Sequence, residues 1–408
     1  MHTHTGLRGG TLKHERKKPC VAIGCQTRRG PHVPASPMKS LLFLLLAVTA
    51  FAANESPEDL KRREAIPFGG DFKPNPKVGA FVVVGHGARI LVSKDDGKTW
   101  TQSFFAAPGA DHGPWATKAV AYTGGVFVVP VGWGAPTIYL ASDDALNWRH
   151  FTKGTAKLPE AKGDARVMPG TWGIAAGKGT FVGSGYMTFS ATSDLGQSFA
   201  AFGMWGAFKD DPRGKLSTHH VGTVYCGDAS GRFLALGDNR GDTGAKFGNL
   251  FASDDLGKTW KWIAPKGLDA STGRGEMLCN GRLLVMTDKD AANAWTSTDA
   301  GETWTGPHAT GTQRASLSVV GNEFWLCGKK SRASSDGQTW RDLPAAVPDG
   351  KVIASDSGTL ISIHPQRTTI QRSTDSGKTW QEVHQYTPPD IKGGAQGLRA
   401  GAWGLVAP

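Results

Sequence analysis

Beyond residue 77 the hydrophobic positions come in short runs that polar turn residues separate. Apolar, β-branched and aromatic residues dominate runs such as 80–84, 126–131 and 323–327, and Gly, Pro, Asn or Asp interrupts them. This pattern predicts short β-strands, and there is almost no helical periodicity. One earlier segment differs: Ser-Pro-Glu-Asp at 56–59 offers a capping Ser, a first-turn Pro and early acids. It predicts one short helix at 57–64, which ends before an Ile-Pro pair.

An eight-residue phrase, Ser-Thr-Asp-Ser-Gly-Lys-Thr-Trp at 373–380, marks a recurrent junction between these strands. Related copies stand at 93–100, 253–260 and 297–304, with a Phe-ended copy at 192–199 and copies one residue shorter at 142–148 and 334–340. We expect the Asp to bond turn N–H groups, the Gly to supply a positive φ and the Trp to anchor the next strand in the core. The phrase is therefore predicted to be a structural hairpin corner, called the corner motif below, and its Asp residues are not counted as catalytic acids.

The spacing of the seven corner motifs predicts the architecture. Successive motifs start 49, 50, 61, 44, 37 and 39 residues apart. A period near 45 residues, with enough strand in each repeat for one four-stranded blade, predicts an all-β, seven-bladed β-propeller. In the second blade we expect strands at 117–122, 126–131, 137–142 and 147–152, from innermost to outermost. The first blade lacks an innermost strand, which 397–401 can supply to close the ring. The strand-like residues 403–408 then compete with 80–84 and stay unassigned.

The phrase Ser-x-Asp-x-Gly-x-Thr-Trp, after an apolar run that starts at Phe81, resembles the Asp-box or bacterial neuraminidase repeat. The resemblance covers nearly all of residues 78–401. It implies a propeller of the sialidase-like superfamily, a group that includes sialidases, xyloglucan-cleaving glycosidases, sortilin-type receptors and photosystem II assembly factors. Because these proteins include enzymes and pure binding proteins, the resemblance predicts the fold far more sharply than the activity.

The chain before the repeats divides into three parts. A Met-Lys start, an 11-residue apolar stretch and a small-x-small site predict a signal peptide at 38–52, cleaved after Ala52. The stretch is too short to span a bilayer comfortably, so no membrane span is expected. Residues 1–37 are predicted to be an upstream extension or disordered. Residues 53–77 form a lead-in with the short helix, and 78–408 form the propeller of a secreted or periplasmic protein, expected to be a monomer.

Charge and cysteine content exclude several functions. The net charge is +11, but residues 1–52 carry +7 of it, so the remainder gives no basic patch for nucleic acid. Cys20 and Cys25 lie in the leader. Cys226, Cys279 and Cys327 have no zinc-like spacing, and we expect neither metal nor cofactor. Buried free thiols are favoured, and a Cys226–Cys279 bridge between neighbouring blades is the alternative.

In propellers the ligand site usually lies in a central funnel, at loops that enter the innermost strands or join the second and third strands. Polar candidates for catalysis there are Asp111, His112, Arg166, His219, His220, Arg274, Glu276 and Arg314. Aromatic candidates for ligand binding are Trp115, Trp133, Trp172, Trp205 and Tyr186. If they face the funnel, the tryptophans suit stacking on sugar rings; the alternative is that they wedge between blades. The same loops also hold His86, Asp349 and His364.

The resemblance leaves three functions open. A retaining sialidase needs three Arg, a Tyr polarised by a Glu, and an Asp acid; here Ala65 stands where its first Arg belongs, and seven corners argue against its six blades. A carbohydrate-active enzyme of another kind, glycoside hydrolase or polysaccharide lyase, is one alternative, and an assembly-factor-like protein-binding propeller is another. We favour an exported propeller that binds a carbohydrate or protein ligand in its funnel.

Overall fold

A computed structural model describes most of the chain from Ser56 onward, all within a compact unit that spans residues 48–408. The described residues are 56–69, 72–107, 113–133, 136–151, 168–169, 171–185, 188–208, 210, 221–225, 231–237, 250–268, 274–364, 366–386 and 397–408. The predicted upstream extension and signal peptide lie outside them.

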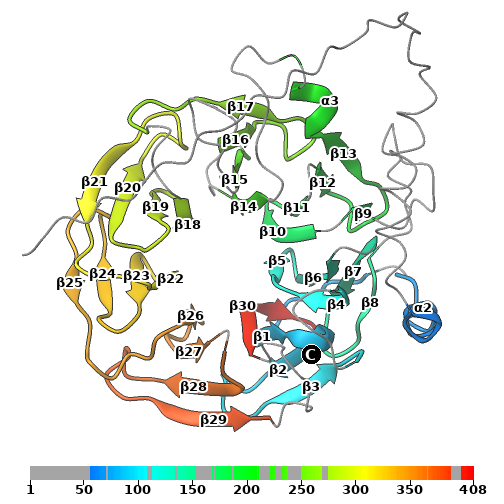
Figure 1. Cartoon of the computed structure of the whole chain (residues 1–408). Coiled ribbons are helices and arrows are strands. Elements are labelled where there is room, and N and C mark those ends of the chain that lie inside the picture. The colour runs from blue at the N-terminus through cyan, green and yellow to red at the C-terminus, as the bar shows by residue number, and fades with distance from the viewer. Residues whose placement is uncertain are drawn as a thin grey trace, which may run out of the picture. The chain divides into compact units, whose positions relative to one another are not determined.

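Within the described residues the strands form seven antiparallel sheets that follow one another around a ring (Figure 1). Numbered from the N-terminus, the blades are β30-β1-β2-β3, β4/β5-β6-β7-β8, β10–β13, β14–β17, β18–β21, β22–β25 and β26–β29, each from the innermost to the outermost strand. The prediction of a seven-bladed all-β propeller with four-stranded blades is confirmed.

The innermost strands are β30 (Leu398–Val406), β4 (Gly113–Thr117) with β5 (Ala121–Thr123), β10 (Thr171–Gly177), β14 (Val221–Tyr225), β18 (Arg274–Cys279), β22 (Ser316–Val320) and β26 (Lys351–Ala354). The second strands are β1 (Val78–Gly85), β6 (Val126–Trp133), β11 (Thr180–Gly185), β15 (Phe233–Gly237), β19 (Leu284–Asp288), β23 (Glu323–Cys327) and β27 (Leu360–Ile363). The third strands are β2 (Arg89–Ser93), β7 (Pro136–Ser142), β12 (Thr188–Thr192), β16 (Leu250–Ser253), β20 (Asn293–Ser297), β24 (Arg332–Ser334) and β28 (Thr369–Ser373). The outermost strands are β3 (Thr101–Phe104), β8 (Arg149–His150), β13 (Ala200–Gly203), β17 (Lys261–Ile263), β21 (Thr305–Ala309), β25 (Arg341–Asp342) and β29 (Gln381–Gln385).

Blade 2 differs in detail from the prediction. Its innermost strand is split, because β4 and β5 pair with different parts of β6 and residues 118–120 lie between them. The outermost strand β8 is two residues long rather than six. A two-residue strand, β9 (Met168–Pro169), also pairs with β7. The predicted strand positions 126–131 and 137–142 are confirmed within β6 and β7.

Strand β30 closes the ring. It pairs with β1 from Val78 to Gly85, so the predicted innermost strand at 397–401 is confirmed and the apparent competition from 403 onward disappears: the same strand simply continues. Close approach to blade 2 explains a glycine here, since a Cβ on Gly404 would lie 2.5 Å from the Tyr122 ring. The Tyr122 hydroxyl donates to the Leu405 carbonyl at 2.5 Å and accepts from the Leu405 N–H at 3.0 Å.

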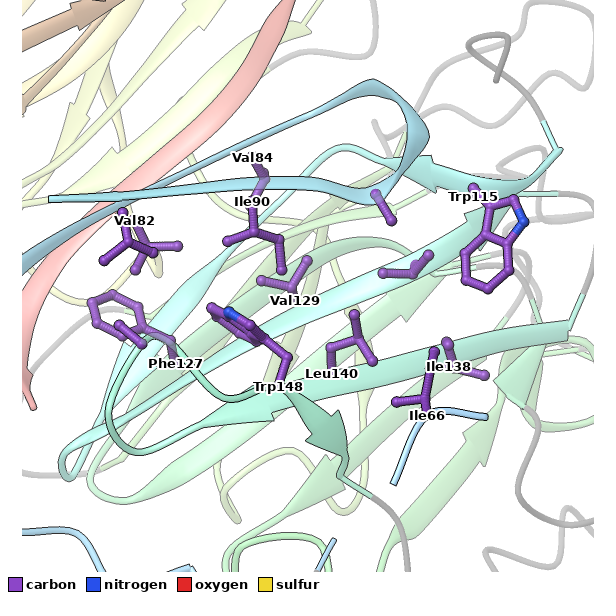
Figure 2. Close-up of a cluster of buried hydrophobic side chains, with 14 of the residues drawn as sticks. Ile66, Val82, Val84, Ile90, Trp115, Phe127, Val129, Ile138, Leu140 and Trp148 are labelled. Carbon is purple, nitrogen blue, oxygen red and sulfur yellow. The ribbon is translucent and has the colours of Figure 1, made fainter. Parts of the chain in front are cut away.

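The core lies between neighbouring blades because successive residues of a strand point to opposite faces. In β1, Val82 and Val84 pack towards blade 2, in the cluster of Figure 2, whereas Phe81 and Val83 pack with Ile361 of blade 7. Both faces are therefore buried, which explains why the strand is apolar at successive positions rather than alternating.

The corner motifs have the predicted geometry. In the last copy, Asp375 accepts hydrogen bonds from the Ser373 hydroxyl at 2.8 Å and from the Thr379 N–H and hydroxyl at 2.9 and 2.6 Å. These bonds, above all those from Thr379, hold the pKa of Asp375 at about 2. Gly377 has φ 82°, as expected, and Ser376 before it also has a positive φ of 60°, which the sequence did not predict. The carboxylate therefore acts as the organising group of a turn.

The lead-in packs along the outer edge of blade 2. Helix α2 (Pro57–Glu64) has the expected Ser cap. After it, the Phe68 ring stacks on His150 of β8 at 4.8 Å, and the His150 N–H donates to the Pro67 carbonyl at 2.8 Å. Because β8 has only two residues, part of the outer edge of blade 2 would be uncovered, and this segment covers it. None of the helices in the described residues is long and apolar enough to cross a membrane.

Candidate functional site

The innermost strands begin at one end of the ring, which we call the leading end; the corner motifs lie at the opposite end. Neighbouring innermost strands run side by side there: the Val352 N–H of β26 donates to the Ser318 hydroxyl of β22 at 2.9 Å. The connections between second and third strands reach the same end, so each blade brings two segments to it. Loops gathered by a rigid scaffold are where propellers and other β-folds usually carry binding residues.

Four of the seven innermost strands lose their regular register near the leading end. In β30, Val84 pairs with Ala400 and Gly85 with Leu398, so Arg399 is an extra residue. In β10, Thr171 pairs with Gly185 and Gly173 pairs with Ser184. Trp172 is therefore an extra residue in the same way. Such β-bulges redirect side chains and are over-represented beside active sites.

The other two irregular strands are β18 and β4. In β18, Arg274 pairs with Asp288 and the next pair is Met277 with Met286, so two residues, the second being Glu276, oppose a single residue of β19. In β4 three residues centred on Trp115 oppose one residue of β6. Three of the residues predicted for the site from sequence, Glu276, Trp115 and Trp172, therefore coincide with irregular pairing.

Glu276 links three blades. Its Oε1 lies 2.5 Å from Lys351 Nζ of blade 7, and its Oε2 accepts from the Leu317 N–H of blade 6 at 2.5 Å. Its own N–H donates to the Thr287 hydroxyl at 3.1 Å, because the bulge displaces it from the regular ladder. The Glu276 and Lys351 side chains remain 37% and 33% exposed, so both charges can also meet a solute.

Arg399 lies in blade 1, beyond blade 7. Its Nε donates to His86 Nε2 at 3.1 Å, and His86 belongs to the short 3-10 turn η1 (His86–Ala88) between β1 and β2. An arginine can only donate, so this His86 nitrogen acts as the acceptor. In blade 7, Asp349 pairs with Arg367 at 2.8 Å and lies 3.8 Å from His364 Nε2. Blades 5, 7 and 1 thus bring charged groups to the leading end.

Other predicted residues have different positions. Trp115 is 3% exposed and packs in the cluster between blades 1 and 2 (Figure 2). Its indole N–H donates to Asp59 of α2 at 2.6 Å, so this tryptophan wedges between blades instead of joining an aromatic wall. Arg314 has a φ of 52°, and its N–H donates to the Asp290 carbonyl at 2.6 Å, which fixes the connection between β21 and β22.

For several predicted residues only the backbone is described. Arg274, Trp133 and Trp172 lie in β18, β6 and β10, and Trp205 lies in α3 (Met204–Phe208). The remaining predicted residues, Asp111, His112, Arg166, Tyr186, His219 and His220, lie outside the described residues.

The thiols and potential metal ligands complete the description. Cys279 and Cys327 are free, and burial raises the pKa of the Cys327 thiol to about 12, so it is inert. Cys226, the other half of the alternative bridge, is outside the described residues. In the part of the chain that is described, no group of three or more His, Cys, Asp or Glu residues could hold a metal ion.

Sequence reasoning missed Lys351 and Arg399 as site residues. Lys351 opens a four-residue strand without a motif, and Arg399 gains its position from the register of β30 on β1. The sequence feature that the two share is recognisable only once the topology is known: both are basic residues at the first or second position of an innermost strand.

Comparisons with known proteins agree on the fold. Residues 264–391 match the family described as the DUF6242 beta propeller domain. No curated protein shows significant sequence similarity to the chain.

Several solved structures are similar in shape. A putative 6-phosphogluconolactonase from Bacteroides uniformis is 12% identical with a TM-score of 0.52, over 80% of this chain and 99% of that one. Another from Bacteroides fragilis is 10% identical with a TM-score of 0.50, over 82% and 99%. A protein from Lactobacillus plantarum is 9% identical with a TM-score of 0.50, over 81% and 100%. At such identities the likeness shows the fold alone.

Proposed function

We propose that this chain is an exported propeller that binds a carbohydrate ligand at the leading end of its ring. The observation that carries the proposal is the set of four irregular innermost strands near this end, because bulges are typical of strands that present side chains to a site. Apart from the buried Trp115, the irregular pairings place two described polar side chains here, those of Glu276 and Arg399, and they lie on different blades.

The chemistry of these residues suits a sugar. A sugar ring offers hydroxyls that both donate and accept, so its sites combine a carboxylate acceptor, cationic donors and an aromatic face. Glu276 supplies the acceptor, and Lys351 and Arg399 supply donors. A protein ligand is the other outcome that the binding test below can return.

We also assign the corner motifs to the Asp-box repeat. The assignment is supported by the shared hydrogen bonds of Asp95, Asp255, Asp299 and Asp375, each of which accepts from a Ser two positions before and a Thr four positions after. The sialidase-like superfamily is part of the same proposal.

Export is the third element. Expression of the full chain in a bacterium with an intact secretion system should yield a secreted or periplasmic protein whose intact mass begins at Ala53. A mass that retains residues 1–37 would contradict the proposed start and signal peptide. Gel filtration of the same product should give a monomer.

The decisive experiment is a glycan array followed by calorimetric titration of the best ligand. Glu276→Gln and Arg399→Gln should each weaken binding at least tenfold, since each removes a charge-assisted hydrogen bond. Glu323→Gln is the matched control: it loses a carboxylate that pairs with Arg341 on the outer part of blade 6. Binding that is equal in all three variants would place the site elsewhere, and turnover of chromogenic glycosides would favour an enzyme instead.

A further inference from the structure

Corner motifs pack against the preceding blade as well as shaping their own. A Cβ added to Gly257 of blade 4 would lie 2.6 Å from Val182 of blade 3, and one added to Gly301 of blade 5 would lie 2.5 Å from Leu234 of blade 4. In these two motifs the corner glycine therefore leaves room for the second strand of the preceding blade. The residue just before this glycine also has a positive φ and is held close to the junction.

In four of the five eight-residue motifs, the residue before the glycine is small or apolar; these residues are Leu195, Leu256, Ala300 and Ser376. In blade 1 it is Asp96. This substitution of a carboxylate falls at the junction between blades 7 and 1.

Asp96 is the centre of a hydrogen-bond cluster formed with blade 7. Its carboxylate accepts from three hydroxyls in the connection between β26 and β27, namely Ser355 at 3.2 Å, Ser357 at 2.9 Å and Thr359. Arg372 of β28 donates through Nη2 to the Asp96 carboxylate at 3.2 Å and through Nε to the Asp96 carbonyl at 2.7 Å. Five donors of one blade thus converge on one residue of the next.

The adjacent Asp95 makes a contrasting set of contacts. It accepts from the Ser93 hydroxyl at 2.8 Å and from the Thr99 N–H and hydroxyl at 2.9 and 2.7 Å, all inside its own corner motif. Two neighbouring carboxylates therefore have separate tasks: Asp95 shapes the corner, and Asp96 reaches across the junction.

This junction is the one where the ring is closed by pairing. At every other junction the outermost strand of one blade continues into the innermost strand of the next blade. After blade 7 the chain continues into β30, but β1, β2 and β3 come from the other end of the propeller and are held to β30 and blade 7 by noncovalent contacts. If the ring opens without breaking a chain connection between strands of the propeller, it opens at this junction.

We propose that Asp96 and its four partner side chains form a latch that keeps blade 7 on blade 1 and controls the opening of the ring. The latch lies at the corner end, whereas β30 carries Arg399 at the leading end of blade 1. Opening of the latch therefore frees blade 7 from β1–β3 without requiring any change in the other six junctions. The inference does not depend on the proposed ligand.

Hydrogen exchange of the folded full chain, followed by mass spectrometry, tests the latch, because exchange measures the local opening of each segment. Asp96→Ala should speed exchange at least tenfold in β27 and β28 of blade 7 and in β1 and β2 of blade 1, with β16 and β20 unchanged. Asp95→Ala is the matched control, one position away with the same loss of a carboxylate, and its effect should stay within blade 1.

Two results would overturn the latch: equal exchange profiles for the two variants, or an Asp96→Ala effect confined to residues 93–104. If Asp96→Ala does not fold, Thr359→Val decides instead, since it removes a single donor from the blade 7 side. It should speed exchange at least threefold in both blades; a change limited to blade 7 would contradict the inference.

Discussion

Glu276 and Lys351 are 75 positions apart in the chain, yet Glu276 Oε1 lies 2.5 Å from Lys351 Nζ. The pair joins blade 5 to blade 7 over blade 6, whose Leu317 N–H holds the other carboxylate oxygen. Because three successive blades contact one carboxylate, these contacts stabilise the leading end at the place where we propose that the ligand binds.

Lys351→Met should lower the free energy of unfolding by about 1 kcal/mol, the upper end for a partly exposed ion pair. Glu276 keeps its bond to Leu317 and stays partly solvated, which limits the cost. Lys330→Met is the control, because Lys330 forms a weaker ion pair: its side chain is 60% exposed and its Nζ lies 4.0 Å from Asp342 Oδ1. Urea unfolding monitored by tryptophan fluorescence compares the two variants. Equal midpoints would show that the Glu276–Lys351 ion pair does not stabilise the fold.

The corner motifs predict a dependence of stability on acid. Their hydrogen bonds hold the pKa of Asp375 at about 2, below the ordinary value of 3.8, and lower the pKa of Asp144, Asp194, Asp255 and Asp299 against the opposing effect of burial. A folded-state pKa below the unfolded one stabilises the fold above pH 3.8 and loses that stabilisation as pH falls towards the folded value.

The melting temperature should therefore fall between pH 4 and pH 2, as far as these carboxylates determine it. Asp375→Asn cannot titrate at this position, so it should start with a lower melting temperature at pH 6 and lose less on acidification than the unaltered chain. Thermal scans at half-unit steps of pH measure both slopes. Parallel curves for the two proteins would contradict a stabilising role for the Asp375 carboxylate.

Ring closure predicts a sharp cost at one glycine. Gly404→Ala places a Cβ 2.5 Å from the Tyr122 ring, so overpacking should lower the free energy of unfolding by about 1–3 kcal/mol. Gly203→Ala meets no atom within 4 Å and should be neutral or slightly stabilising. Chemical denaturation of both variants gives the comparison, and a neutral Gly404→Ala would mean that β30 can shift without loss.

The fold was predictable because its signal is local and repeated. Each corner motif combines an Asp acceptor and an aromatic anchor within eight residues, and all but the copy at 142–148 also have a glycine at positive φ. Seven such units fix the blade number. Register is not local: Arg399 becomes a bulge residue only through the pairing of β30 with β1, more than 300 positions away in the chain. Lys351 likewise gains its meaning from Glu276 in another blade.

The same limit explains the error at Trp115. Its place at the start of an innermost strand suggested an aromatic wall, but three residues of β4 oppose one of β6, and this irregularity decides which way the indole points. The sequence also gave no sign that helix α2 would supply a carboxylate, Asp59, as the partner of its N–H.

Trp115→Ala should therefore act on stability rather than on a ligand. Removing a large aromatic side chain from a packed cluster costs about 3–5 kcal/mol, and Trp115 is 3% exposed between blades 1 and 2. Trp115→Phe retains most of the packing but leaves Asp59 without the indole donor, so it should cost about 1–2 kcal/mol.

Asp59→Asn removes the charge from the same contact. Combined with Trp115→Phe, it should lower the free energy of unfolding by less than the sum of the single effects, because both substitutions act on one hydrogen bond. Urea titrations of the three variants measure these values, and calorimetry with the glycan-array ligand should give unchanged affinity for folded Trp115→Phe. A stable Trp115→Phe that no longer binds would instead return this tryptophan to the site.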